Sequence, residues 1–442
     1  MYKNIYFIGI GGIGMSAIAR YYNAKGFKVS GYDKTPSPLT EELENEGIAI
    51  HYEDNIDFVP KEIEETLVVY TPAIPRDMGE LVYVQTKGYR VIKRSRMLGE
   101  ISQGLRCMAV AGTHGKTTTS TLTSHIFTAS GEGCSAFLGG ISKNYNSNLL
   151  ISTNDVMVAE ADEFDRSFLQ LFPEIAVITS MDADHLDIYG DEQHIREAFK
   201  AFASQVSGTV IAKYGLDITK SDTKAEIKTY SYGDSRADFH AEPIGDGLFN
   251  IHYPGGIIEA CSLGIPGWVN IENAVAASAI GLTYGLAPQK IKAALASFSG
   301  VKRRFDIQVK RKDCVYIDDY AHHPEEISAA LSSIRNSYPD MKLTVAFQPH
   351  LYTRTRDFAP EFAAALSKAD KLILLDIYPA REEPIPGVTS EIIFKDVTCP
   401  EKVLLKRSEF MDYLKTEKPE VLVTLGAGDI DRFVGEIAGM LQ

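Results

Sequence analysis

The stretch that decides the fold is Ala109-Val110-Ala111-Gly112-Thr113-His114-Gly115-Lys116-Thr117-Thr118. The apolar run from Cys107 to Ala111 predicts a buried strand, and the Thr/Ser-rich segment after the loop predicts a helix. Strand, glycine loop and helix together form a phosphate cradle, because glycines let backbone N–H groups approach phosphate oxygens and the helix N-terminus favours negative charge. In this pattern Lys116 supplies positive charge to the β- and γ-phosphates, and the Thr117 hydroxyl suits Mg²⁺.

Val110 stands where the full P-loop pattern has a glycine, so the stretch is a shortened P-loop. The alternative is a glycine–lysine turn without a ligand, and the strand-to-helix setting favours the phosphate site. The loop does not indicate what receives the phosphate. The residues predicted to bind ATP here are Gly112, Thr113, His114, Gly115, Lys116, Thr117 and Thr118.

Composition limits the class of protein. A chain of 442 residues predicts two or three domains, and 45% hydrophobic with 24% charged residues is ordinary for a globular protein. The formal net charge of -14 argues against a nucleic-acid partner or an anionic membrane, because these need a basic surface.

The five cysteines are scattered without a C-x-x-C pair, which predicts buried free thiols in a reducing compartment. Met1 runs directly into a predicted strand with no signal peptide, and no apolar run reaches membrane-spanning length. A cytoplasmic enzyme is expected.

A second glycine loop, Gly9-Ile10-Gly11-Gly12-Ile13-Gly14, lies between a predicted strand and a helix starting at Met15. A further predicted strand ends at Asp33, which completes a G-x-G-x-x-G fingerprint in a βαβ setting. Taken alone the fingerprint predicts a dinucleotide site, but the same loop holds any diphosphate. Glycines that serve only tight packing are the alternative. The first domain is expected to span 1–104.

Polar clusters follow two predicted strands in the expected central domain, 105–299. One is Glu160-Ala161-Asp162-Glu163-Phe164-Asp165 and the other is Asp182-Ala183-Asp184-His185-Leu186-Asp187. Ligand-binding groups sit just past the carboxyl ends of parallel strands, so these clusters and the phosphate loop predict a nucleotide with hard divalent cations. Either acid cluster alone would be a solvated turn. The segment from Ser221 to Cys261 predicts a peripheral antiparallel excursion.

The third expected domain, 300–442, repeats the α/β rhythm. Polar clusters again follow its predicted strands: Asp318 to Pro324, Gln348 to Arg356 and Gly426 to Asp429. The adjacent His322 and His323 do not predict zinc, because no third ligand has suitable spacing and no cysteine is near.

These clusters, in this order, resemble the Mur ligase family of cell-wall enzymes over essentially the whole chain, and most closely its alanine-adding branch. The resemblance implies three α/β domains: a Rossmann-like UDP-binding domain, a central P-loop ATPase-like domain with a mostly parallel sheet, and a Rossmann-like domain for the amino acid. It implies that ATP phosphorylates the lactyl carboxylate of UDP-N-acetylmuramate and that L-alanine attacks the acyl phosphate, with Mg²⁺ as cofactor.

The resemblance also assigns residues by matching motifs. Arg304, Asp318, Asn270 and Asn273 match nucleotide-contacting positions, and Lys116, His185, Arg304, His322 and Arg354 match catalytic ones. The metal positions are Thr117, Glu160 and His185, and the amino-acid site is Tyr320, His322, His350 and Arg354. The UDP-sugar site is Gly11, Gly12, Ile13, Gly14, Met15, Asp33 and Thr71.

Four positions depart from the family pattern. Val269, Glu272 and Leu351 replace the usual histidine, leucine and arginine, and Leu351 removes a cation that Arg354 or Arg356 would have to replace. Lys200 lies near the place of a carbamylated lysine in several relatives, and we expect it to be unmodified, as in the alanine-adding branch.

Several alternatives stay open at this point. A recycling ligase that attaches a tripeptide to the same sugar nucleotide would share these motifs. A dinucleotide-dependent oxidoreductase would explain Gly9 to Gly14 and Asp33 but would leave Lys116 and Glu160 without a role. A UDP-sugar sensor without catalysis is a third possibility. The expected assembly is a monomer or homodimer.

Overall fold

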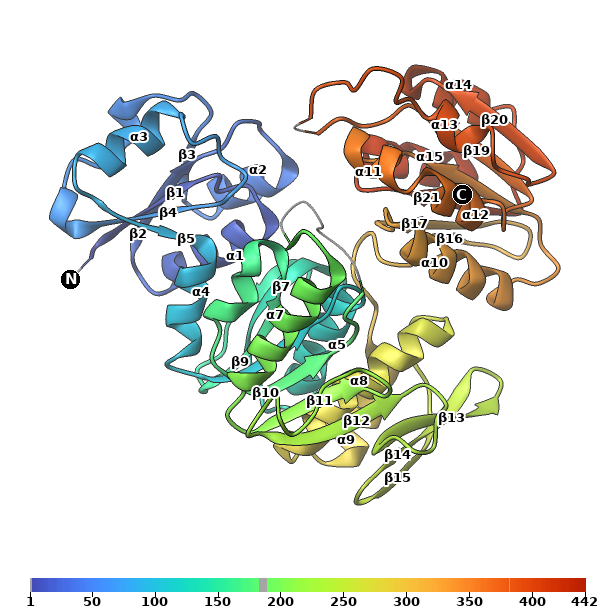
Figure 1. Ribbon diagram of the computed structural model, residues 1–442, viewed down its shortest axis with the longest axis horizontal. Helices are drawn as coiled ribbons and strands as arrows, with labels where there is room; N and C mark the ends of the chain where they lie inside the picture. The colour runs from blue at the N-terminus through green and yellow to red at the C-terminus, as the bar shows by residue number, and fades with distance from the viewer. Residues whose placement is uncertain (1, 183–188, 381) are drawn as a thin grey trace. The chain divides into compact units, whose positions relative to one another are not determined.

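The computed structural model describes residues 2–182, 189–380 and 382–442. Within these residues the chain builds three β-sheets, each with helices packed against it (Figure 1). The predicted α/β fold with mostly parallel sheets is confirmed. The chain forms two compact units, residues 1–264 with 271–299 and residues 265–270 with 300–442. The domain limits 1–104, 105–299 and 300–442, and the ligand of each domain, stay predictions.

The N-terminal sheet is wholly parallel, with strand order β3-β2-β1-β4-β5. This order places the turn between β1 and α1 at the middle of the sheet, where α/β folds bind ligands. The strands are β1 Asn4–Ile8, β2 Lys28–Tyr32, β3 Ala49–His51, β4 Thr66–Tyr70 and β5 Arg90–Lys93; the helices are α1 Ile13–Ala24, α2 Pro38–Asn45, η1 Ile56–Phe58, η2 Ile63–Glu65, α3 Gly79–Thr86 and α4 Arg94–Ser102.

The central sheet has ten strands in the order β15-β14-β13-β12-β11-β10-β6-β9-β7-β8. Strand β6 lies between β10 and β9 and is parallel to both, so the phosphate loop after β6 is flanked by the ends of two buried strands. The first strands are β6 Arg106–Ala111, β7 Ser135–Ser142, β8 Ser147–Leu150, β9 Val156–Ala161, β10 Pro173–Ile178 and β11 Thr209–Lys213; the helices are α5 Lys116–Ala129, η3 Phe164–Gln170, α7 Glu192–Ser204, α8 Trp268–Tyr284 and α9 Pro288–Ser297.

The predicted antiparallel excursion is only partly right. Its first two strands continue the sheet in parallel, and β13, β14 and β15 then form an antiparallel meander. Alternating polar and apolar residues indicate half-buried strands of either direction, so the pattern could not separate the two cases. These strands are β12 Glu226–Ser231, β13 Phe239–Gly245, β14 Leu248–Tyr253 and β15 Gly256–Cys261.

The C-terminal sheet has the order β16-β17-β21-β18-β19-β20 and is parallel except for β16. Its strands are β16 Asp306–Lys310, β17 Val315–Asp319, β18 Leu343–Phe347, β19 Lys371–Leu375, β20 Glu401–Leu405 and β21 Val421–Leu425; the helices are α10 Pro324–Ser337, α11 Tyr352–Asp357, α12 Ala359–Leu366, α13 Glu391–Phe394, η4 Arg407–Glu409, α14 Phe410–Leu414, η5 Asp429–Phe433 and α15 Val434–Leu441.

Apolar strand residues form the cores of these sheets, and the five cysteines are buried and free, as predicted. Two predicted strand ends are corrected by the structure. Glu160 is the penultimate residue of β9, and Asp318 and Asp319 end β17, so these acids are strand residues and do not lie in the following loops. Among the described helices, none is both long enough and apolar enough to span a membrane.

Candidate active site

The phosphate loop is held open by contacts with the end of β10. Gly112 has φ +133, and a side chain there would collide with the Thr179 hydroxyl. That hydroxyl donates to the carbonyl oxygens of Ala111 and His114. The His114 amide donates to Ser180 Oγ at 2.9 Å. The loop is therefore fixed from behind, which preorganises it for an anion at the N-terminus of α5.

Lys116, the first residue of α5, folds over this loop. Its Nζ donates to the Gly112 carbonyl oxygen at 2.6 Å, and it forms an ion pair with Glu163 at 2.8 Å. A longer hydrogen bond of 3.3 Å reaches the Thr113 carbonyl oxygen. Burial lowers the pKa of the Lys116 ammonium, but the carboxylates of Glu163, Asp162 and Glu160 outweigh this effect and raise the pKa above its ordinary value. Lys116 is therefore a fixed positive charge at neutral pH.

Glu160 offers an acceptor to a cation. Its Oε2 atom is buried and has no hydrogen-bond partner among the described residues. Gly139 of β7 leaves room for this carboxylate, because a side chain at position 139 would collide with both carboxylate oxygens. A buried carboxylate oxygen without a donor fits a hard divalent cation.

The N-terminal glycine loop is shaped by Asp33. The Gly11 amide donates to Asp33 Oδ2 at 2.7 Å, and the Thr35 amide donates to Oδ1 at 3.3 Å. Asp33 thus holds the loop in addition to any contact with a ligand. Gly9 has φ +87, and a side chain there would lie 2.7 Å from the methyl group of Thr71, so these two predicted positions lie side by side.

Gly12, Gly14 and Met15 lie at the start of α1. Gly12 is the N-cap residue, and Met15 is buried. A side chain at Gly14 would collide with the Arg94 guanidinium, which places a cation beside the glycine loop. The helix N-terminus and this guanidinium both favour an anion.

A hollow of about 120 Å³ lies between the start of α1 and the end of β9. Ile13, Gly14 and Arg94 line it from the N-terminal domain, and Gly139, Glu160 and Asp162 line it from the central sheet. Arg94 also pairs with Asp162 at 3.4 Å. The structure thus brings the predicted UDP-sugar loop and a predicted metal ligand to one cavity.

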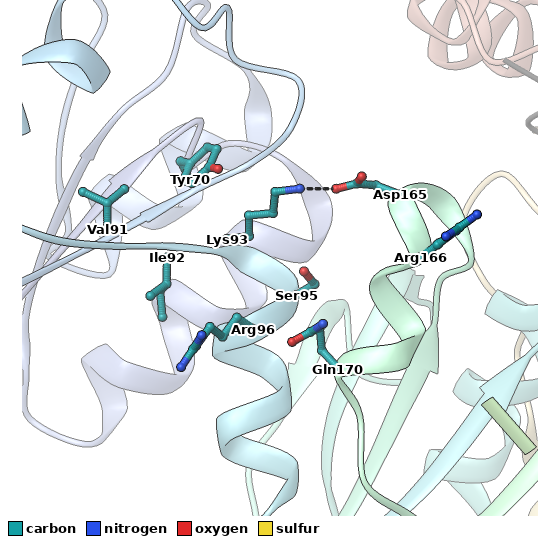
Figure 2. A pocket seen from close by; sticks show the side chains of 9 residues that line it. All are labelled: Tyr70, Val91, Ile92, Lys93, Ser95, Arg96, Asp165, Arg166 and Gln170. Carbon is teal, nitrogen blue, oxygen red and sulfur yellow. Dashed lines mark hydrogen bonds and ion pairs between the residues drawn. The ribbon is translucent and has the colours of Figure 1, made fainter. Parts of the chain in front are cut away.

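A second hollow, of about 280 Å³, lies between β5 and the turn after β9 (Figure 2). Lys93 and Arg96 line it from the N-terminal domain, and Asp165 and Arg166 line it from the central domain. Lys93 and Asp165 form an ion pair of 2.6 Å across it, which joins the two domains within one compact unit (Figure 2).

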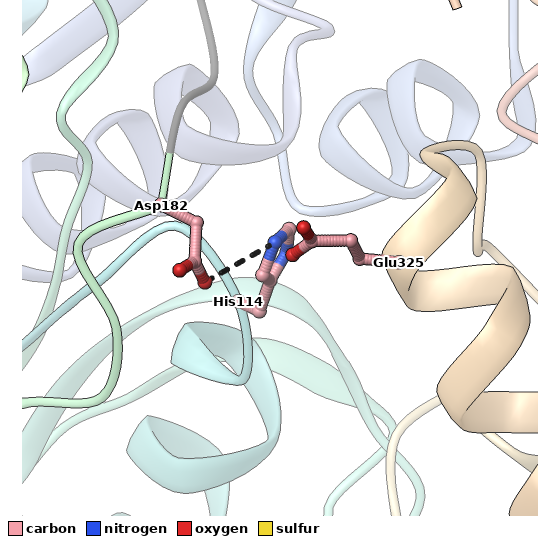
Figure 3. Close-up of side chains that lie close together, drawn as sticks. All are labelled: His114, Asp182 and Glu325. Atoms are coloured by element: carbon pink, nitrogen blue, oxygen red, sulfur yellow. Dashed lines mark ion pairs between the residues drawn. The ribbon is translucent and has the colours of Figure 1, made fainter. Parts of the chain in front are cut away.

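Asp182 lies near the phosphate loop. His114 Nε2 is 3.8 Å from Asp182 Oδ2 (Figure 3), and the Asp182 amide donates to Thr113 Oγ1 at 3.2 Å. Thr117 and Thr118 are buried in the first turn of α5. His185 lies outside the described residues, so its predicted role as a metal ligand stays a prediction.

In the second unit the side chain that bonds the predicted nucleotide-contacting Asp318 is Arg303, not Arg304. Arg303 donates to Asp318 Oδ2 at 3.3 Å, to Asp431 at 3.0 Å and to the Gly426 carbonyl oxygen. The buried Asp319 carboxylate accepts backbone hydrogen bonds of 2.8 Å from Phe305 and Ala321. Burial raises the pKa of Asp318, and it raises the pKa of Asp319 to about 6.

The aromatic cluster of this unit contains four residues: Tyr320, His322, His350 and Tyr378. The Arg304 guanidinium lies 4.9 Å from the centre of the Tyr320 ring. The rings of His322 and His350 are 6.1 Å apart, and His350 stacks on Tyr378 at 5.8 Å. The predicted amino-acid site residues Tyr320, His322 and His350 therefore do lie together.

His322 is neutral at pH 7. Its Nδ1 lies 3.0 Å from the Tyr320 carbonyl oxygen, so Nδ1 carries the proton and Nε2 is an acceptor. Burial lowers the pKa of His322 to about 4, the cations of Arg354 and Arg304 lower it further, and Glu326 opposes them. Arg354 thus acts electrostatically on His322.

The two predicted adenine contacts have partners within the protein. Asn270 Nδ2 donates to the Pro266 carbonyl oxygen at 2.5 Å. Asn273 Oδ1 accepts from Thr119 Oγ1 at 3.2 Å and would lie 2.9 Å from a side chain at Gly115. Asn273 therefore packs against the start of α5, beside the predicted phosphate site.

Three of the four positions that depart from the family pattern have a defined local setting. Glu272 forms an ion pair with Lys213 at 2.8 Å, and Leu351 is buried with φ +72 at the start of α11. Lys200 pairs with Asp217 at 2.8 Å, and this hydrogen bond raises the pKa of its amine. Nothing in the structure explains Val269.

Sequence reasoning indicated Arg94 as a possible cation for a phosphate, but it did not single out Glu163 as the partner of Lys116. Glu163 was only one member of an acid cluster. No signal in the sequence separates Glu163 from the other carboxylates of this cluster, because β9 ends at Ala161 and Asp162 follows it first.

The comparisons cover the whole chain. The profile of the Mur ligase family catalytic domain matches residues 4–106, that of the Mur ligase middle domain matches 110–281, and that of the glutamate ligase domain matches 303–428. The UDP-N-acetylmuramate--L-alanine ligase of Porphyromonas gingivalis is 50% identical over 452 residues, covering 100% of this chain and 99% of the relative.

The enzyme of the same name from Parabacteroides distasonis is 52% identical over 448 residues, covering 99% of this chain and 97% of the relative. The crystal structure of the UDP-N-acetylmuramate-alanine ligase from Thermotoga maritima superposes with a TM-score of 0.84 at 26% identity, covering 99% of this chain and 98% of that chain. Two phosphate-type glycine loops in one unit, the buried carboxylate between them and these full-length similarities lead to one conclusion: the chain belongs to the Mur ligase family.

Proposed function

We propose that the chain is an ATP-dependent ligase that joins L-alanine to the lactyl carboxylate of UDP-N-acetylmuramate in peptidoglycan synthesis. The products are UDP-N-acetylmuramoyl-L-alanine, ADP and phosphate. The observation that carries the proposal is the 50–52% identity, over essentially the full length, to enzymes named for this activity. The hollow that Ile13 and Gly14 line together with Glu160 supports the proposal, because it places the N-terminal glycine loop beside a proposed metal ligand.

The first half of the reaction is assigned to the first unit. The start of α1, with Gly11 to Gly14, holds the diphosphate of the sugar nucleotide, and Arg94 adds a cation beside it. The Gly112 to Thr118 loop holds the ATP phosphates. Lys116 stabilises the charge on the phosphoryl group as it passes to the lactyl carboxylate, which is electrostatic catalysis.

Mg²⁺ fits this site because Glu160 presents a buried oxygen without a donor. Thr117, Glu160 and His185 would hold the ion. When bound, it would neutralise charge on the phosphate oxygens.

The second half is assigned to the second unit. His322 Nε2 is an available base for a proton from the attacking amine, since the ring is neutral at pH 7. The amine nitrogen bonds to the acyl carbon, the bond to the phosphate oxygen breaks, and phosphate leaves with the electron pair. Arg304 and Arg354 would bind the anionic groups of the alanine and the acyl phosphate. We infer a cytoplasmic monomer or homodimer.

The test is a substrate-omission assay. Phosphate release should require ATP, Mg²⁺, UDP-N-acetylmuramate and L-alanine together, and release without L-alanine would contradict the proposal. Lys116→Met should reduce acyl-phosphate formation at least about 100-fold. Full activity of this variant in cells would favour a sensor role.

Two further measurements address the alternatives. Competition between L-alanine and the tripeptide separates this activity from the recycling ligase. Tight NADH binding without UDP-sugar binding would support the oxidoreductase.

A further inference from the structure

Glu163 is an almost fully buried carboxylate that, among the residues the structure describes, pairs with the phosphate-loop lysine. Its side chain is 2% exposed, and Lys116 Nζ lies 2.8 Å from Oε2 and 2.9 Å from Oε1. A buried charge is costly unless it is paired, so each member of this pair fixes the position of the other.

The turn after β9 is built to keep Glu163 in this place. Asp165 and Arg166, the second and third residues after Glu163, both have a left-handed backbone conformation, with φ of 52° and 54°. The Glu163 carbonyl oxygen accepts from the Arg166 amide at 2.9 Å and from the Tyr189 hydroxyl at 2.6 Å. Non-glycine residues rarely adopt this conformation, so the two left-handed residues and the two hydrogen bonds give the turn after Glu163 a defined shape.

The ammonium of Lys116 has three N–H donors, and the contacts it makes are unequal. Two are short, to the Gly112 carbonyl oxygen at 2.6 Å and to Glu163 at 2.8 Å; the third, to the Thr113 carbonyl oxygen, is 3.3 Å. The third N–H is the one that a phosphate oxygen can take over without breaking either short contact.

From this arrangement we infer that Glu163 is a positioning residue for the proposed ligase: it and the Gly112 carbonyl oxygen fix the Lys116 ammonium so that one N–H stays available to the transferred phosphoryl group. The inference rests on the proposed function. Glu163 also offsets part of the lysine charge before the reaction, so it should limit the binding of nucleotide in the ground state while it orients the lysine for the transition state.

The test compares Glu163→Gln with the wild-type enzyme in two measurements. The first is kcat for ligation with all substrates saturating, and the second is the Kd for ADP from calorimetry. The inference requires kcat to fall by more than threefold while the Kd for ADP rises by no more than twofold. A merely structural defect in the loop would weaken ADP binding along with catalysis.

The matched control is Asp165→Asn. This change removes a carboxylate from the same turn, but its partner is Lys93, and asparagine tolerates a left-handed backbone. It should leave kcat within threefold of wild type. Glu163→Asp keeps the charge but shortens the reach by one methylene, so its kcat should lie between those of Glu163→Gln and wild type.

Two results would overturn the inference. One is a kcat of Glu163→Gln within threefold of wild type, and the other is an ADP Kd raised by more than twofold. If Glu163→Gln does not yield folded protein, Glu163→Asp is held to the same two limits. A wild-type enzyme that releases no phosphate with the full substrate set would contradict the proposed function itself. An active wild-type enzyme with an unaffected Glu163→Gln variant would contradict only the role inferred for Glu163.

Discussion

Arg20 Nη1 donates a hydrogen bond of 2.6 Å to Asn148 Oδ1, which ties the helix after the N-terminal glycine loop to strand β8 of the central sheet. Asn148 is fully buried, and its Nδ2 donates to the carbonyl oxygen of Ile13, the first residue of α1, at 2.6 Å. The sugar-nucleotide loop is thus anchored to the domain proposed to bind ATP.

Asn148→Ala should destabilise the protein, because it leaves one buried Arg20 donor without its acceptor and removes one of the donors to the Ile13 carbonyl oxygen, which keeps its hydrogen bond from the Ser16 hydroxyl. A loss of about 1–3 kcal/mol in the free energy of unfolding is expected, together with a raised KM for UDP-N-acetylmuramate. Urea unfolding and initial rates measure the two effects. Asn23→Ala on the same helix is the control, because its hydrogen bond to the Glu46 carbonyl oxygen is exposed, and we expect a change within about 0.5 kcal/mol. Equal effects of the two variants would refute the anchoring role.

Gly139→Ala should weaken Mg²⁺ binding without unfolding the protein. A methyl group at position 139 collides with the Glu160 carboxylate. The Glu160 side chain must therefore move, and its buried Oε2 atom leaves the position proposed for a metal ligand. We expect the Mg²⁺ concentration for half-maximal activity to rise, and Mn²⁺ binding followed by electron paramagnetic resonance to weaken in parallel. Gly435→Ala, where an added methyl group meets open space, is the control. Unchanged Mn²⁺ affinity in Gly139→Ala would exclude Glu160 as a metal ligand.

Arg354, not Arg356, should replace the cation that Leu351 removes. Arg354 lies near enough to His322 to lower its pKa, whereas Arg356 is half exposed and forms an ion pair with its neighbour Asp357 at 2.7 Å. Arg354→Gln should therefore lower kcat/KM for L-alanine by about 10–100-fold, a loss of about 1.4–2.7 kcal/mol of transition-state binding. Arg356→Gln on the same short helix should change it by less than threefold. The reverse order in steady-state kinetics would place Arg356 in the site.

The parts of the site that were predictable from sequence are local in the chain. Gly112, Gly115 and Lys116 lie within five residues, and the strand before them and the helix after them follow from apolar periodicity alone. The same holds for Gly9 to Gly14 between β1 and α1. Backbone geometry over a few residues dictates these loops, so the sequence contains the full signal.

The contacts that tune the site join distant residues and could not be predicted from sequence. Gly139 makes room for Glu160 from a neighbouring strand, and Asn148 meets Arg20 across 128 positions. Nothing in the run from Glu160 to Asp165 separates Glu163, which pairs with Lys116, from Asp165, which pairs with Lys93. In the structure the two differ in place: Glu163 is buried against Lys116, whereas Asp165 lies in the left-handed part of the turn after β9.

His322 should titrate near pH 4 in the substrate-free protein. Burial disfavours the charged ring, so its pKa lies at about 4, below the ordinary 6.5. Between these two values the unfolded chain takes up a proton that the native ring does not, so this residue makes the free energy of unfolding fall as the pH is lowered from 6.5 to 4. Above pH 6.5 both states are neutral at this position, and its effect on stability vanishes.

Long-range nitrogen–proton NMR spectra of histidine-labelled protein measure the pKa of each histidine ring directly. The signal that is absent from the spectrum of His322→Gln belongs to His322. At pH 7 the spectrum should show a neutral ring protonated at Nδ1, the atom that faces the Tyr320 carbonyl oxygen at 3.0 Å. The fall of kcat/KM for L-alanine at low pH should therefore not show the pKa of 6.5 that an ordinary histidine would give. A ring protonated at Nε2 at pH 7 would remove His322 as the base proposed for the attacking amine, whereas a ring that titrates near 6.5 would contradict the effect of burial on its pKa.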